Sequence, residues 1–139
     1  MISFKKINKN NQDDIKKLFF LIKSRKYNIS NTQNPNFEDH KKFVLNNPYR
    51  EWLFIIQKDI LIGSAYITFE NFIGINLIDA NKNTYITIIK LLLSEFKPLP
   101  EIKSIRNKNF LFNLSPKNKK YIEALEDLKM IHIQNTYTS

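Results

Sequence analysis

Three strand-like runs follow one another between Trp52 and Ile78, and they constrain the fold more than any other feature. β-Branched and aromatic residues dominate 52–56, 60–69 and 72–78. The connections at 57–59 and 70–71 are so short that consecutive strands must run antiparallel. The middle run is apolar on both faces: Leu61, Ala65, Ile67 and Phe69 on one, and Ile60, Ile62 and Tyr66 on the other. Because both faces need cover, the sequence predicts a mainly antiparallel sheet with helices on both sides.

The segments before this sheet predict one strand and two helices. Ile2, Phe4 and Ile7 form a strand-like opening, and apolar positions from Ile15 to Ile22 at helical spacing predict a helix from Asn11 to about Lys26. Residues 28–36 are rich in Asn, Ser, Thr and Pro, which is typical of a loop. A second helix around 40–44 is expected to end before Pro48.

The segments after the sheet predict alternating helices and strands. A third helix follows the polar break at 79–83 and carries apolar residues from Tyr85 to Phe96. A strand is expected at 109–114, and Ser115–Pro116 is a typical start for a fourth helix. Alternating residues at 130–137 predict a final half-exposed strand. The fold class is α/β, or α+β, in one domain over 1–139.

Composition excludes several kinds of chemistry. The chain has no Cys and only two His, ninety-two positions apart, so no metal site is expected. The net charge of +9 would suit an anionic partner, but the lysines are scattered and typical of a solvated surface, which ranks nucleic acid last among the partners. No leader segment or apolar run of about 20 residues is present, so we expect a cytoplasmic protein without a membrane partner.

The order of elements resembles that of the GNAT acetyltransferase superfamily across nearly the whole chain. The best local match is the segment from Asn118 to Met130, which is similar to the family's closing motif of an Asn that opens a helix and a Gly-Phe pair twelve residues later. Lys129 stands in place of the Gly, Met130 in place of the Phe, and Leu125 where many members carry a Tyr that protonates the departing thiolate. The resemblance implies acetyl-CoA as co-substrate and Asn118 as a residue that contacts it.

The family's glycine-rich turn, which wraps the pyrophosphate of coenzyme A, has no glycine in this chain. The equivalent stretch runs from Ala80 to Tyr85. In the family, successive backbone N–H groups at a helix N-terminus hold the phosphates. The resemblance implies that the cofactor-binding residues are Leu77, Ile78, Asn81, Lys82, Asn83, Thr84 and Asn118. Side-chain bulk in the turn, above all that of Tyr85, predicts weaker coenzyme A binding.

The resemblance also implies residues for catalysis. The amine must be kept neutral by a carboxylate or a water chain, and Glu70 is the only carboxylate near the start of the fourth strand. Tyr66 and Tyr121 are candidate acids for the departing sulfur, and Tyr49, Arg50 and Trp52 are candidates for the rim of an acceptor pocket. Each also has an ordinary interpretation: an exposed carboxylate, or aromatic residues of the core.

Two functions follow from these features. The first is an acetyl-CoA-dependent N-acetyltransferase that acts on a primary amine of a small molecule, with an amino sugar as the suggested acceptor. The second is a GNAT-like domain with reduced catalysis that serves in binding or partner interaction, which the missing glycines and Leu125 favour. A homodimer stays open in both.

Overall fold

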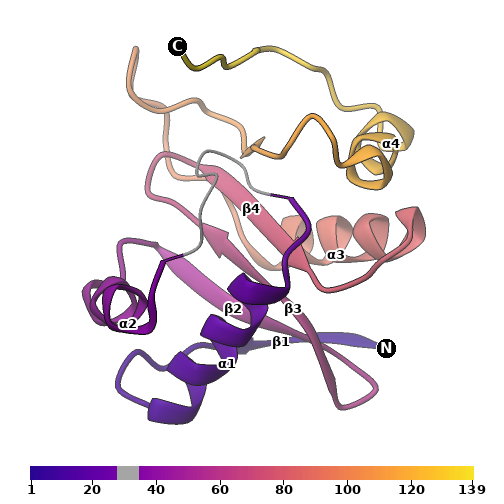
Figure 1. The fold of residues 1–139 in the computed structure, drawn as a ribbon. Coiled ribbons are helices and arrows are strands. Elements are labelled where there is room, and N and C mark those ends of the chain that lie inside the picture. Colours follow the sequence, from indigo (N-terminus) through magenta and orange to yellow (C-terminus); the bar gives the residue numbers. More distant parts are fainter. Residues whose placement is uncertain (28–34) are drawn as a thin grey trace.

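The computed structural model describes residues 1–27 and 35–139, and their central element is a five-stranded sheet. The strands are β1 (Ile2–Lys6), β2 (Glu51–Gln57), β3 (Ile60–Ile67), β4 (Phe72–Leu77) and β5 (Leu111–Phe112), and they lie in sequence order across the sheet (Figure 1). The pairs from β1 to β4 are antiparallel, whereas β4 and β5 are parallel. The predicted antiparallel meander is therefore confirmed. Most of the loop predicted at 28–36 lies outside the described residues.

Helices cover both faces of the sheet, as the doubly apolar middle strand predicted. The helices are α1 (Gln12–Ser24), α2 (Phe37–Asn46), α3 (Lys82–Glu95) and α4 (Lys119–Asp127). The first two pack on one face around Ile15, Leu18 and Trp52. The last two pack on the other face around Ile75, Ile88 and Tyr121 (Figure 1). The mixed α/β fold is the one that the strand pattern predicts.

A β-bulge in β3 overturns part of the predicted face assignment. Ile55 pairs with Gly63 and Ile56 with Leu61, so Ile62 is an extra residue in the ladder. Because an extra residue reverses the alternation, Leu61 packs with α1 and α2, whereas Ala65 packs with α3 and α4. Placing Leu61 and Ala65 on one face was wrong, and so was placing Ile62 beside Tyr66.

Three predicted boundaries also differ from the structure. The first helix ends at Ser24 rather than near Lys26. The fourth helix starts at Lys119, because the Asn118 side chain caps it by accepting the N–H of Tyr121, while Ser115 and Pro116 lie in a preceding turn. The fifth strand has two residues in place of the six predicted at 109–114.

The strand predicted at 130–137 is absent from the part of the chain that the structure describes. Residues 130–139 have no regular secondary structure, and Ile131 and Ile133 are 83% and 64% exposed. The alternating pattern was suited to a strand, but a strand also needs an adjacent edge to pair with, and β5 presents only two residues.

Candidate functional site

The β4 and β5 strands separate after two residue pairs. Phe72 pairs with Leu111 and Ile73 with Phe112, and the Asn113 N–H donates to the Ile73 carbonyl at 3.3 Å. Within the described residues, the second half of β4, residues 74–77, pairs with β3 alone. The prediction that these strands run parallel and then diverge is confirmed. Among the described residues, the backbone groups of β4 that point toward β5 therefore have no strand partner beyond Ile73, apart from the Ile73 carbonyl itself.

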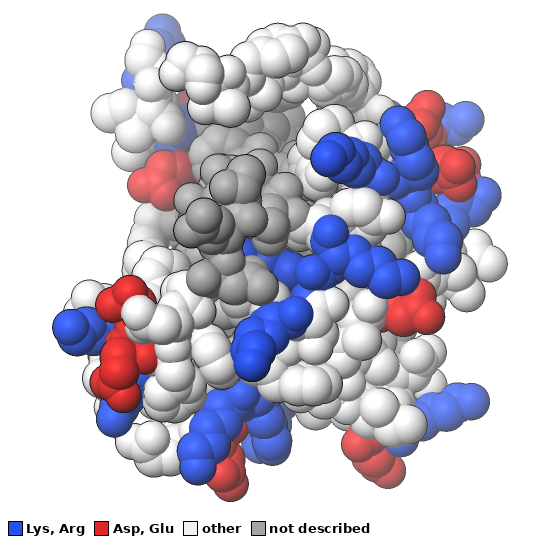
Figure 2. Space-filling view, in the orientation of Figure 1, with Lys and Arg blue, Asp and Glu red and all other residues white. Residues whose placement is uncertain are grey.

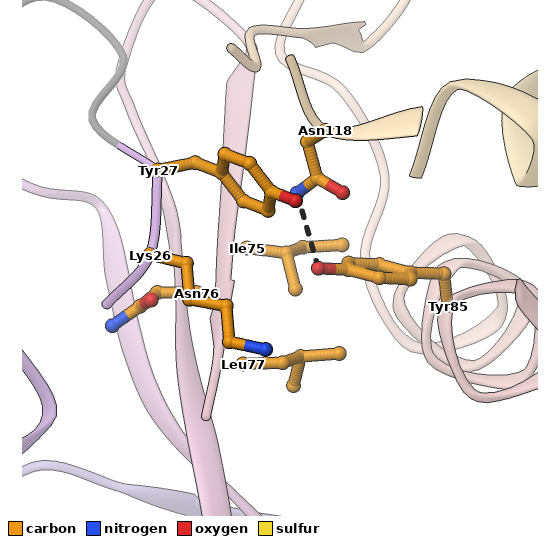
Figure 3. A pocket seen from close by; sticks show the side chains of 7 residues that line it. All are labelled: Lys26, Tyr27, Ile75, Asn76, Leu77, Tyr85 and Asn118. Carbon is orange, nitrogen blue, oxygen red and sulfur yellow. Dashed lines mark hydrogen bonds between the residues drawn. The ribbon is translucent and has the colours of Figure 1, made fainter. Parts of the chain in front are cut away.

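A small hollow lies beside this open part of β4. It consists of two adjoining spaces that share several lining residues, with volumes of about 50 Å³ and about 30 Å³. It is lined by Leu77 from β4, Tyr85 from α3, Asn118 from the start of α4 and Tyr27 from the segment after α1 (Figure 3). Ile78, which follows β4, also lines it. Four separate parts of the chain thus meet around one end of β4.

The hollow is bridged by a hydrogen bond between Asn118 and Tyr85. The Asn118 side-chain N–H donates to the Tyr85 hydroxyl at 3.2 Å, and its side-chain oxygen accepts the N–H of Tyr121 at 3.3 Å (Figure 3). Both Asn118 and Tyr85 are buried. One amide therefore caps α4 and also holds Tyr85 across the hollow. Burial raises the pKa of Tyr85, and the hydrogen bond from Asn118 partly offsets that rise.

Tyr121 carries a buried hydroxyl that lacks a hydrogen-bond partner among the described residues. Its ring stacks on that of Tyr85, with centroids 4.7 Å apart and planes 18° from parallel. Burial raises the pKa of Tyr121 well above its usual value, and the neighbouring hydroxyls of Tyr85 and Tyr66 raise it further. Tyr121 is therefore protonated at neutral pH and has a hydrogen available for an acceptor.

The turn before α3 is organised by capping. The Asn81 side-chain oxygen accepts the backbone N–H of Thr84 at 2.9 Å and its hydroxyl at 3.1 Å. Lys82 forms an ion pair with Asp127 at 2.8 Å, which raises the pKa of that lysine and ties the start of α3 to the end of α4. Asn83 accepts the Thr87 hydroxyl through its carbonyl. In this turn the predicted cofactor-binding side chains of Asn81, Lys82 and Thr84 thus have structural partners, as that of Asn118 has.

The structure does not bring Glu70 to the hollow. Glu70 is exposed in the turn that precedes β4. The hollow borders β4 from Ile75 onward, and five residues of strand span about 16 Å. Leu77, Ile78 and Asn118 do come together there, and Leu125 packs against the core instead. The role of Glu70 as a base stays a prediction.

The predicted acceptor rim is partly assembled. The Tyr49 ring stacks on that of Tyr66, with centroids 4.2 Å apart, and meets Trp52 edge to face at 4.8 Å. Burial raises the pKa of Tyr49 and that of Tyr66. Arg50 points elsewhere, because its guanidinium donates to the carbonyl of Lys97 at 2.8 Å. The cluster is thus an aromatic core on the face covered by α1 and α2.

Sequence reasoning missed Lys26, Tyr27 and Lys120, which all line the hollow. None belongs to a motif, and they come from two segments more than 90 positions apart. They come together through the packing of α1 on one face of the sheet and of α4 on the other. The described residues hold no cluster of His, Cys, Asp and Glu suited to a metal, and no described helix is long and apolar enough to cross a membrane.

The sheet order, the helices on both faces and the divergence of β4 from β5 define a GNAT-like N-acetyltransferase fold. Among solved structures, the chain is similar to the aminoglycoside N-acetyltransferase AAC(6')-Ib11, with a TM-score of 0.56 and 12% identity over 91% of this chain and 84% of that one. It is also similar to a possible acetyltransferase from Clostridium difficile 630, with a TM-score of 0.50 and 13% identity over 100% and 96% of the two chains. No family model and no curated protein matches the sequence. At these identities the likeness establishes the fold.

Proposed function

We propose that the protein is an acetyl-CoA-dependent N-acetyltransferase that acts on a primary amine of a small molecule. The observation that carries the proposal is the open half of β4, beside a hollow that α3 and α4 border. An extended pantetheine arm presents amides that an unpaired strand edge can hydrogen-bond. A backbone N–H of residues 74–77 would also polarise the thioester carbonyl.

The reaction requires few groups. The neutral amine attacks the acetyl carbonyl, a C–N bond forms, the C–S bond breaks, and the thiolate takes up a proton. Tyr121 is our candidate for the donor of that proton, because its hydroxyl lacks a partner among the described residues and its ring stacks on that of Tyr85, which lines the hollow. Its raised pKa makes it a weaker acid than an ordinary tyrosine, so the transfer requires direct contact with the thiolate. Solvent would take the amine proton, unless the exposed Glu70 accepts it through water.

The hollow must widen to admit the acyl donor. Small-molecule pockets usually enclose about 300 to 1,000 Å³, whereas this one has about 50 Å³. The bond between Asn118 and Tyr85 spans the space that the arm would use. Parting these two side chains costs about one hydrogen bond, or roughly 1 kcal/mol, so acetyl-CoA should bind more weakly than it would to an open site.

The same bond favours a second candidate function, a GNAT-like binding domain without catalysis. If the hydrogen bond between Tyr85 and Asn118 persists, acetyl-CoA cannot enter, and the surface around the hollow can only contact a partner molecule. The two functions differ in whether acetyl-CoA enters.

Titration calorimetry with acetyl-CoA, followed by a thiol-release assay with a panel of amines that includes amino sugars, tests the proposal. We expect a dissociation constant in the micromolar range or above, with slow release of coenzyme A that depends on the amine. Tight, submicromolar binding would contradict the closed hollow. Absence of both binding and transfer, in protein whose thermal unfolding is cooperative, would favour the binding domain.

A further inference from the structure

We propose that side-chain cations from two walls of the hollow, Lys26 and Lys120, hold the diphosphate of the acyl donor in place of a glycine-rich turn. This inference rests on the proposed function and assigns its anion subsite. The side chains of the turn before α3 are already engaged, because Asn81 caps the helix and Lys82 pairs with Asp127. Another source of positive charge is therefore needed beside the arm.

The two lysines come to the hollow from elements that cover opposite faces of the sheet. Lys26 follows α1, and its side chain points toward Leu77 on β4 (Figure 3). Lys120 lies in the first turn of α4. Within the described parts of the chain, neither forms an ion pair, and Asp79 is the only carboxylate that lines the same hollow. Figure 2 shows Lys and Arg side chains across the middle and upper right of the molecule in the view of Figure 1, with some Asp and Glu side chains among those at the upper right. A divalent or trivalent anion there would meet two cations and one carboxylate.

Uncharged groups of the hollow would also attract an anion. The helices α3 and α4 both begin beside it, capped by Asn81 and Asn118, and each helix start carries a partial positive charge. The hydroxyls of Tyr27 and Tyr85 lie close enough for Tyr27 to raise the pKa of Tyr85. Both hydroxyls can donate to phosphate oxygens. The hollow thus has cations at its rim and hydrogen-bond donors at its centre.

The position of the hollow matches the end of the arm where phosphates would lie. It borders Leu77, Ile78 and Ala80, at the carboxyl end of β4, whereas β4 and β5 are joined at the opposite end. An arm laid along β4 with its thioester near Gly74 would therefore place its diphosphate between Lys26 and Lys120. The ligand class is a diphosphate ester of a nucleotide.

Binding to single variants tests the subsite. Dissociation constants for coenzyme A and for inorganic pyrophosphate are measured by calorimetry on the wild type, Lys26→Met and Lys120→Met. Matched controls are Lys17→Met on α1 and Lys119→Met on α4, which are both exposed and not among the residues that line the hollow. Each hollow variant should weaken both ligands about tenfold, as expected for one charge-assisted contact, and the controls should change neither.

A donor without the diphosphate separates this inference from the proposed function. S-Acetylpantetheine carries the thioester and the arm, so transfer from it should be equal in the wild type and in both hollow variants. Unchanged coenzyme A affinity in Lys26→Met and Lys120→Met would overturn the subsite and leave the acetyltransferase standing. Lysine-dependent pyrophosphate binding without acetyl transfer would support the subsite and overturn the acetyltransferase. Absence of binding by either anion to the wild type would overturn the subsite.

Discussion

The ring of Tyr66 lies directly across Gly74, its register partner on β4. A β-carbon at position 74 would overlap the ring and hydroxyl of Tyr66. The ring is held from behind by its stack on Tyr49. Tyr66 therefore reaches over β4 toward the place where β4 and β5 diverge, and its hydroxyl contributes to the raised pKa of Tyr121.

Gly74→Ala should destabilise the protein by about 1–3 kcal/mol, because an added methyl group overpacks a ring that cannot retreat. The free energy of unfolding in urea measures the loss. In a Tyr66→Ala background the ring is gone, so the same substitution should cost less than about 0.5 kcal/mol. An equal cost in the two backgrounds would show that the ring is not the cause.

Tyr121→Phe should separate stability from activity. A buried hydroxyl without a partner destabilises the native state, so its removal should leave the free energy of unfolding unchanged or raise it by up to about 1 kcal/mol. If the hydroxyl protonates sulfur, acetyl transfer should fall about 100-fold. Thermal unfolding and the thiol-release assay on one preparation give both numbers. A less stable variant with full activity would contradict both parts.

Asn71→Ala should release the connection between α3 and β5. The fully buried Asn71 side chain donates to the carbonyls of Leu99 and Asn107 at 2.9 and 2.8 Å, and accepts the N–H of Leu99 at 2.8 Å. Its backbone is left-handed, with a φ of 70°. Loss of three hydrogen bonds and strain on Ala should cost about 3–5 kcal/mol.

Asn71→Gly is the matched control, because glycine adopts a left-handed backbone without strain. It should be about 1 kcal/mol more stable than Asn71→Ala, while the three side-chain hydrogen bonds stay lost. Urea unfolding curves of the two variants decide the matter. A wild-type stability in Asn71→Ala would show that the connection does not depend on this side chain.

Stability should fall as the pH drops below about 6.5, and His40 should be one cause. Its Nε2–H donates to the carbonyl of Ile15 at 3.0 Å, while the buried Nδ1 has no partner among the described residues. Burial lowers the pKa of His40, and the bond to Ile15 partly opposes this. Because the unfolded chain binds the proton more readily, protonation favours unfolding. The stability that neutral His40 provides is complete at pH values above the pKa of His40 in the unfolded chain. It is lost as the pH falls from there through the lower pKa that His40 has in the folded protein.

His40→Gln keeps a donor for Ile15 but does not titrate. The loss in melting temperature between pH 7.5 and pH 5.5 should therefore be smaller in this variant than in the wild type. Identical pH profiles would assign the loss to other groups.

Local pattern was enough to predict the meander and the helices, because alternation and helical spacing are properties of neighbouring residues. Local pattern could not predict the bulge at Ile62, because nothing in the sequence of Ile60, Leu61 and Ile62 marks which residue is extra. The strand prediction for the end of the chain was wrong for a related reason. Alternation at Ile131 and Ile133 is typical of a strand, but a strand also needs a free sheet edge to pair with.

The candidate site was predictable only where it is continuous in sequence. Leu77, Ile78 and Asn118 do line the hollow. Lys82 was named as a phosphate contact because it lies in the turn, yet its ion pair with Asp127 depends on how α4 packs on α3. Lys26 and Lys120 could be found only from the packing that brings their segments together.

The sheet order carries a consequence for how the chain folds. Partners on β2, β3 and β4 are close in sequence, so their meander can form early at a small loss of chain entropy. Phe72 pairs with Leu111, which lies 39 positions away, so this pair should form later. The pair also depends on the connection between α3 and β5 that the Asn71 side chain holds. Substitutions at Leu111 should therefore speed unfolding and leave the refolding rate nearly unchanged in stopped-flow measurements. By the same reasoning β1 also joins late, because its partners on β2 lie about 50 positions away. The diverging strands that frame the hollow would then assemble after the meander and open before it.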